Sequence, residues 1–182
     1  MLTEWVADEI AEEEAIAEER LAVPHEMDAL LRDTPIFRLP NLRQPILLPP
    51  EATVRDAAVR MHREGLGCVL VCDGERLLGV FTERDVLGRV VAEGRDGTTT
   101  RLADVMTPDP DFLTPDDGIA WALNRMVVGG FRHVPLLDPK DRPVGVVSMR
   151  HIVEYLVDAF PGPVLNIAPN PSQAMPRERE GA

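Results

Sequence analysis

The sequence predicts an α+β fold made of two copies of one unit, with its elements in the order β-α-β-β-α. The first observation is a motif that occurs twice, as GVFTERD at residues 79–85 and as GVVSMRH at residues 145–151. Each copy follows an apolar run typical of a buried strand and precedes apolar residues at helical spacing. The second observation is that a shift of 65 residues also aligns the upstream positions, for example Met61 with Met126. A repeat of this length indicates a duplicated structural unit.

The first copy is expected over residues 38–94. A short apolar strand at 46–48 precedes a helix at 53–65, which starts with a Thr-x-x-Asp capping pattern and stops at a glycine. Residues 67–72 are a near-continuous apolar run, as in a strand that is covered on both faces. An Asp-Gly turn then makes a hairpin with the next strand, over residues 73–81.

The second copy is expected over residues 101–160, after a polar loop at 94–100 that has no periodicity. A brief helical turn at 102–106 ends at a Thr-Pro pair, and residues 112–113 are the counterpart of the first short strand. A helical apolar stripe then starts at Ile119 and stops at a pair of glycines. Both copies thus contain the same elements in the same order.

These motifs resemble a pair of CBS domains, the Bateman module, over about residues 38–160. The resemblance rests on the Gly-hydrophobic-x-Thr/Ser-x-x-Asp signature, on the segments DVMTP at 104–108 and HVPLLD at 133–138, and on their joint order. It implies a pseudo-twofold module of repeats packed through their sheets, which senses adenosine-type ligands rather than doing chemistry. It also implies a disk-shaped homodimer, formed through the apolar helices after Thr82 and Ser148.

Composition separates the chain ends from the module. Residues 1–35 hold eleven acids against two arginines, so −9 of the formal net charge of −12 lies there. We expect residues 1–37 to be an acidic helical arm and connector. The alternatives to a solvated helix are a docking or dimerisation arm, which Trp5 favours, and disorder. The Pro-rich, polar residues 161–182 predict a disordered tail. Nucleic acid is excluded as a partner because the chain has a single Lys and dispersed Arg.

Cys68 and Cys72 are the two cysteines of the chain. In a strand they lie roughly 13 Å apart at about 3.3 Å per residue, too far to bridge or to share a metal. Buried structural thiols in a reduced, cytoplasmic protein are therefore expected, and the absence of a signal peptide agrees. No apolar run approaches the roughly 18 residues of a membrane helix, so no membrane partner is expected.

Thr82 and Asp85 are the predicted ribose ligands. With Thr82 as the N-cap, Asp85 falls at the third helical position, where a capping box alone explains both residues. A carboxylate can also accept hydrogen bonds from the two hydroxyls of a ribose, as in dinucleotide-binding folds. The sequence leaves both interpretations open.

The family implies the rest of the predicted cleft. Leu47, in the strand at 46–48, would flank an adenine, and Arg132 with His133 would contact phosphate, for which arginine is well suited. Arg150 would reach across from the second repeat to the ligand held by the first. Each of these residues has an alternative role in packing or at the surface.

The second cleft is expected to be weaker. It would hold Ser148, His151 and Arg84, and a neutral imidazole has one acceptor nitrogen where the family has a carboxylate. We therefore expect one nucleotide per chain, in the cleft that contains Asp85.

Two functions follow from these expectations. The first is a regulatory module that binds AMP, ADP, ATP or, less favoured, S-adenosylmethionine, and signals to an effector protein or through homodimerisation. The second is a degenerate scaffold for protein interaction that binds no ligand. The sequence pairs no nucleophile with a base and contains no metal cluster, no cofactor motif and no Gly-rich phosphate loop, so an enzyme is not expected.

Overall fold

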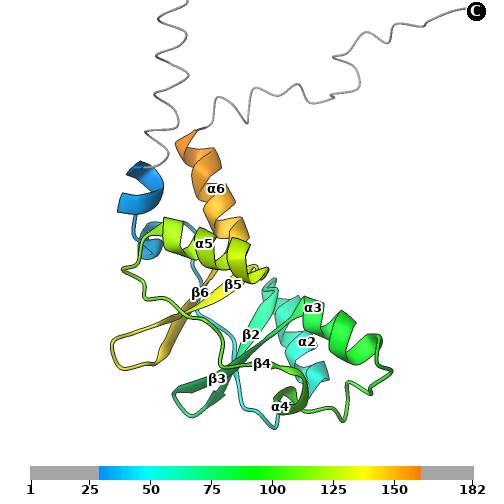
Figure 1. Cartoon of the computed structure of the whole chain (residues 1–182). Helices are drawn as coiled ribbons and strands as arrows, with labels where there is room; N and C mark the ends of the chain where they lie inside the picture. Colours follow the sequence, from blue (N-terminus) through cyan, green and yellow to red (C-terminus); the bar gives the residue numbers. More distant parts are fainter. Residues whose placement is uncertain (1–28, 161–182) are drawn as a thin grey trace, which may run out of the picture.

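The computed structural model describes residues 29–160, which form two α/β lobes joined through their sheets (Figure 1). The first lobe contains a four-stranded sheet in the order β1-β2-β3-β4. Its elements are β1 (Leu47–Leu48), α2 (Val54–Glu64), β2 (Cys68–Asp73), β3 (Arg76–Thr82), α3 (Glu83–Asp85), the π-helical turn η2 (Val86–Val91), α4 (Leu102–Val105) and β4 (Thr107–Pro108). Strand β1 is parallel to β2, and the other pairs are antiparallel.

The second lobe repeats this arrangement with fewer strands. Its elements are the 3-10 turn η1 (Ile36–Arg38), α5 (Ile119–Gly129), β5 (His133–Leu137), β6 (Pro143–Ser148) and α6 (Met149–Ala159). The antiparallel pair β5-β6 corresponds to β2-β3, and Leu113 bridges Leu136 in parallel as Leu47 pairs with Leu70. The predicted α+β fold with two β-α-β-β-α repeats is confirmed.

Each lobe buries a segment that lies beside or within the other repeat in sequence. The Ile36 N–H donates to the carbonyl of Asp117 at 2.8 Å, and Ile36 is fully buried in the core of the second lobe. In the same way the Leu102 N–H donates to the carbonyl of Ala52 at 2.9 Å, and Leu102 is fully buried in the core of the first lobe. The prolines around Ile36 predict a connector, whereas the structure buries this side chain in the second lobe.

A third apolar cluster joins the two sheets. It contains Cys68, Leu70, Cys72 and Val80 of the first repeat, with Val146 of the second packed against it. Burial raises the pKa of the Cys68 thiol to about 12 and that of Cys72 to about 11, so both remain protonated at neutral pH. Both are free thiols inside this interface, as the strand spacing predicts.

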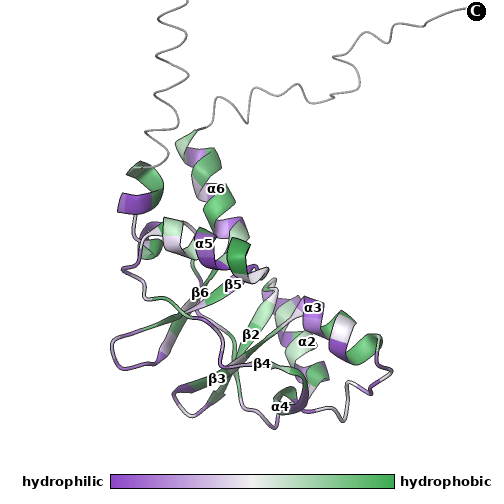
Figure 2. Cartoon of the chain, in the orientation of Figure 1, coloured by the Kyte–Doolittle hydropathy of each residue, from purple (hydrophilic) through white to green (hydrophobic). Residues whose placement is uncertain are grey.

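Several helices carry hydrophobic residues, which are green in Figure 2. Some of these side chains are exposed to solvent. Leu87 and Val91 on η2 are 66% and 64% exposed, and Val153 on α6 is 50% exposed. These are the helices that follow Thr82 and Ser148, where the sequence predicts dimer contacts, and that assembly stays a prediction. On α5, Trp121 is 60% exposed and lines neither of the two pockets that lie between the lobes.

The predicted acidic arm and tail lie largely outside the described residues. Residues 29–33 form a helical stretch, and Leu31 packs against the core of the second lobe. Thr34 continues this contact, with its hydroxyl 3.2 Å from that of Tyr155 on α6. Across residues 29–160, no helix is both long and apolar enough to cross a membrane.

Candidate ligand-binding pockets

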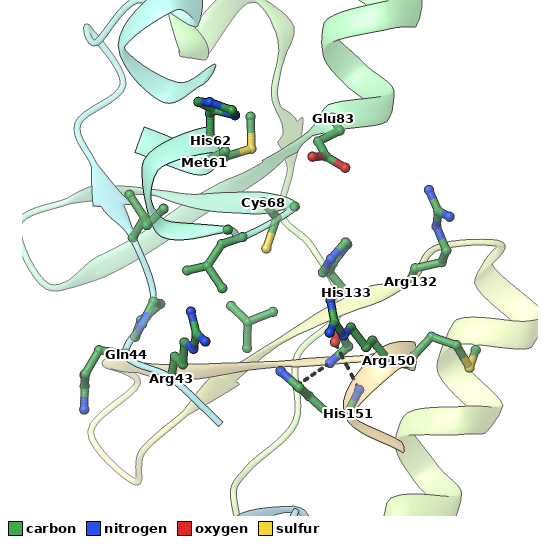
Figure 3. Close-up of a pocket in the computed structure, with 18 residues that line it drawn as sticks. Arg43, Gln44, Met61, His62, Cys68, Glu83, Arg132, His133, Arg150 and His151 are labelled. Carbon is green, nitrogen blue, oxygen red and sulfur yellow. Dashed lines mark hydrogen bonds between the residues drawn. The ribbon is translucent and has the colours of Figure 1, made fainter. Parts of the chain in front are cut away.

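Two pockets open where the lobes face each other. The first, which we call the Asp85 pocket, has a volume of about 400 Å³ and is lined by the end of β3, the start of α3, residues 107–111 and residues 129–133. The second, the His151 pocket, has a volume of about 620 Å³ (Figure 3). It is lined by residues 43–46, the end of α2, the start of β2, the end of β6 and the start of α6.

A capping box forms the floor of the Asp85 pocket. The Asp85 Oδ2 accepts from the Thr82 N–H at 2.9 Å and from the Thr82 hydroxyl at 2.7 Å, which confirms the predicted cap. The other oxygen, Oδ1, lies 3.3 Å from the Arg89 Nε in an ion pair, and the Asp85 side chain is 12% exposed. A carboxylate oxygen can accept more than one hydrogen bond, so Oδ1 retains the capacity to accept from a ligand hydroxyl.

The His151 pocket has an equivalent cap, but the side-chain atom that the cap leaves free is a donor rather than an acceptor. The His151 Nδ1 accepts from the Ser148 N–H at 3.2 Å, as the dashed line in Figure 3 shows. In a neutral imidazole one nitrogen accepts and the other carries the proton, so this contact assigns the proton to Nε2. Burial lowers the pKa of His151, which keeps the ring neutral at pH 7. The free nitrogen is therefore a donor, whereas Asp85 offers an acceptor.

Gly67, Glu83, Arg132 and His133 line both pockets and form a shared wall. A Cβ on Gly67 would lie 3.2 Å from the His133 imidazole and 3.4 Å from the Glu83 Oε2, so these groups approach closely over the glycine. Burial, followed by the charge of Arg132, lowers the pKa of His133 to about 4. Within residues 29–160 the Arg132 guanidinium has no hydrogen-bond or ion-pair partner, so its donors remain available to a ligand.

The structure brings together four of the predicted site residues. Thr82, Asp85, Arg132 and His133 all line the Asp85 pocket. Ser148 and His151 line the other pocket, as the two-cleft prediction requires. The predicted ribose and phosphate groups of the main cleft therefore face one cavity.

Three predicted residues lie elsewhere. Arg150 lines the His151 pocket and pairs with Glu154 at 2.7 Å, whereas Arg84 lines the Asp85 pocket and donates to the Gly130 carbonyl at 2.8 Å. The two arginines follow equivalent caps, and each stays beside the cap of its own repeat. The predicted placement of Arg150 in the first cleft and of Arg84 in the second is therefore corrected.

Leu47 lines neither pocket. Strand β1 pairs with β2, whereas the strand that ends at Thr82 is β3, and its outer neighbour is β4. The segment beside the Asp85 carboxylate is thus residues 107–111 rather than 46–48. Ile46, next to Leu47, lines the His151 pocket instead.

Sequence reasoning missed several lining residues. Arg89, Asp109 and Asp111 line the Asp85 pocket, and Arg43 and His62 line the other. Arg89 could have been found from its spacing, because residues four apart on a helix face each other. The others come from segments whose partners depend on the exchange between repeats.

Comparison with known proteins identifies the family. The sequence model of the CBS domain matches residues 41–92 and 102–158. The chain belongs to the CBS domain family. Proteins of this family are generally regulatory rather than catalytic.

Relatives agree with this assignment. The chain is 38% identical over 109 residues to the meiotically up-regulated gene 70 protein of Schizosaccharomyces pombe, a match that covers 60% of the chain but 15% of that protein. A putative signal-transduction protein with CBS domains from Burkholderia ambifaria has a TM-score of 0.60 at 28% identity, covering 64% of the chain and 84% of that structure. A CBS domain protein from Pyrobaculum aerophilum, solved in complex with AMP, has a TM-score of 0.60 at 25% identity. This match covers 69% of the chain and 99% of that structure.

The shared wall predicts a pH dependence of stability. The pKa of His133 is lower in the folded protein, at about 4, than its ordinary value of 6.5, so the unfolded chain binds a proton first as the pH falls. The free energy of unfolding should therefore drop by about 2 kcal/mol between pH 7 and pH 5, and His151 acts in the same direction. Urea unfolding at the two pH values measures this loss.

His133→Gln is expected to remove most of that loss, because glutamine does not titrate. The control is His62→Gln, which removes an exposed histidine that lines only the His151 pocket. Asp138 does not interfere, because hydrogen bonds from Arg142 lower its pKa to about 2, below the range measured. An equal pH dependence in His133→Gln and the parent would contradict a neutral, buried His133.

Proposed function

We propose that the protein is a regulatory sensor that binds one adenosine nucleotide per chain in the Asp85 pocket. The observation that carries the proposal is the presence of a ribose-type acceptor, Asp85, and the cationic side chain of Arg132 around one cavity. AMP, ADP and ATP fit this pairing best, and S-adenosylmethionine, which lacks phosphates, would use it less fully. A volume of about 400 Å³ lies within the usual range of roughly 300–1,000 Å³ for small-molecule sites.

Each part of a nucleotide has a complementary group in this pocket. The Asp85 Oδ1 would accept from a ribose hydroxyl, and the Thr82 hydroxyl lies beside it. The side chains of Val80, Pro110 and Phe131 supply apolar surface for a base. The Arg132 guanidinium and the His133 imidazole would donate to the phosphate.

The family supports the same ligand class. The Pyrobaculum aerophilum protein binds AMP, and the chain aligns with 99% of that structure. The ligand-bound state would be transmitted to an effector protein or through dimerisation. The exposed Leu87, Val91 and Val153 on the helices beside the two caps offer apolar surface for such a contact.

A scaffold that binds no nucleotide is the second candidate, and one observation favours it. The Asp85 carboxylate is already engaged through both oxygens, by Thr82 and by Arg89. If these contacts are its whole function, the residue is a helix cap and the lobes serve protein interaction alone.

Isothermal titration calorimetry with AMP, which carries a single phosphate, tests the proposal. We expect a stoichiometry near one per chain and a ten- to hundredfold loss of affinity in Asp85→Ala. The reason is that each charge-assisted hydrogen bond contributes about 1.5–3 kcal/mol. His151→Ala should leave nucleotide binding nearly intact, because that ring lines the other pocket.

Asp56→Ala is the matched control. Asp56 makes the same capping box with Thr53 at the start of α2 but lines neither pocket, so its loss reports the cost of a cap alone. Asp56→Ala should therefore bind nucleotide like the parent. Unchanged affinity in Asp85→Ala would show that the carboxylate only caps the helix, and no binding by the parent would favour the scaffold.

A further inference from the structure

The two pockets differ sharply in charge. The His151 pocket is lined by three arginines and three histidines but by a single carboxylate, Glu83. The Asp85 pocket is lined by three arginines and one histidine together with four carboxylates. Its carboxylates are Glu83, Asp85, Asp109 and Asp111. The larger pocket therefore has a net excess of cationic groups that the smaller one lacks.

The hydrogen-bonding groups around the His151 cap also favour an anionic ligand. The His151 ring presents a donor nitrogen to its pocket, because the other nitrogen accepts from the Ser148 N–H. Near this cap the described residues offer no carboxylate oxygen comparable to that of Asp85. The groups around the cap can donate to anionic oxygens but are poorly suited to accept from a ribose diol.

We propose that the His151 pocket binds a ligand that carries at least two phosphate groups and is recognised by those phosphates rather than by a ribose. Arg43 and Arg150 come from opposite sides, the first from the segment before β1 and the second from the start of α6. Arg132 completes the cationic surface at the shared wall, beside the neutral ring of His133. Arginine is suited to this role because its planar guanidinium donates two parallel hydrogen bonds to a phosphate.

The arrangement of the side chains supports a convergent site. Figure 3 shows Arg43, Arg150 and His151 in one part of the pocket, whereas Glu83 lies beside His133 at the shared wall. Arg150 is held by Glu154 at 2.7 Å, and Arg43 donates to the Glu64 carbonyl at 3.1 Å. Each arginine thus makes one local contact and has further donors to offer a ligand.

The His151 pocket is large enough to hold an organic group in addition to two phosphates. The pocket measures about 620 Å³, and the apolar side chains of Ile46, Met61, Leu66 and Val146 also line it. An organic diphosphate could place its carbon skeleton against these side chains. The phosphates alone define the class, so inorganic pyrophosphate is a sufficient probe.

The test is calorimetric titration of the full chain with inorganic pyrophosphate in metal-free buffer at pH 7. We expect saturable binding of one pyrophosphate per chain. Arg150→Ala should weaken it about tenfold, since it removes one charge-assisted contact, and Arg43→Ala should do the same. The Arg150 side chain is 84% exposed, so its removal should leave the fold intact.

Arg84→Ala is the matched control. Arg84 occupies the position equivalent to Arg150 after the cap of the first repeat, and it lines only the Asp85 pocket. Its removal costs the same charge but should change pyrophosphate affinity less than twofold. Equal losses in Arg84→Ala and Arg150→Ala, or no pyrophosphate binding by the parent, would overturn the proposal.

Asp85→Ala separates this site from the nucleotide site. The variant should lose AMP binding and keep pyrophosphate binding, and ADP should bind to it no more tightly than pyrophosphate within a few fold. AMP binding without pyrophosphate binding would overturn the second site alone. Pyrophosphate binding without AMP binding would overturn the nucleotide site alone. Much tighter binding of ADP than of pyrophosphate to Asp85→Ala would show that a nucleoside is recognised there, which contradicts phosphate-only recognition.

Discussion

Ile36→Ala is expected to lower the free energy of unfolding of the whole module by about 2–5 kcal/mol. Ile36 precedes the first repeat in sequence, yet its side chain is fully buried among residues of the second. Truncation leaves a cavity where the surrounding elements, α5, β5, β6 and α6, can collapse only in part. A mutation that precedes the first repeat in sequence should thus destabilise the second lobe.

Urea unfolding followed by circular dichroism measures the effect, with Phe37→Ala as the control. Phe37 is the next residue and is 51% exposed, so its truncation should cost less than about 1 kcal/mol. Because each core contains a segment from the other repeat, both lobes should unfold in one transition. Two separate transitions in the parent, or equal losses in both variants, would contradict the exchange of segments.

Gly79→Val should also destabilise the module, by about 3 kcal/mol. A Cβ at this position would lie 2.5 Å from the Met106 sulfur and 2.8 Å from the Thr107 carbonyl oxygen. The sulfur can move, but the carbonyl belongs to β4, which pairs with β3 at this point. Overpacking of this kind typically costs about 1–3 kcal/mol, and a branched side chain falls at the upper end.

The effect of Gly79→Val should reach the Asp85 pocket, because Thr107 and residues 109–111 line it. We expect weaker nucleotide binding together with the lower stability. Gly88→Val is the control: no atom lies within 4 Å of its added Cβ, and valine is a better helix former than glycine. Thermal unfolding of both variants measures the effect. The Gly88 variant is expected to be as stable as the parent, and the Gly79 variant less stable.

Much of the fold could be predicted from the sequence because the duplication repeats every local signal. Thr53, Thr82 and Ser148 each stand three residues before a group that bonds back to the cap, and the structure contains all three capping boxes. The strands could be predicted from apolar runs beside turn residues. The exchange of segments could not, because Ile36 and Leu102 have the same local pattern whichever repeat buries them.

The pockets were less predictable for the same reason. The sequence places Asp85 at a helix start, and that position depends only on nearby residues. Which arginine joins it depends on how the two lobes face each other. Arg84 and Arg150 are equivalent in sequence, and only the assembled structure shows that each stays with its own cap.

If both pockets bind ligands as proposed, the shared wall would make each pocket an effector site for the other. Arg132 and His133 can complete the coordination of an anion on one side only by becoming less available on the other. Thermodynamic linkage requires this antagonism to be reciprocal: the factor by which a diphosphate weakens AMP equals the factor by which AMP weakens the diphosphate. The module would then report the ratio of two metabolites rather than the concentration of either.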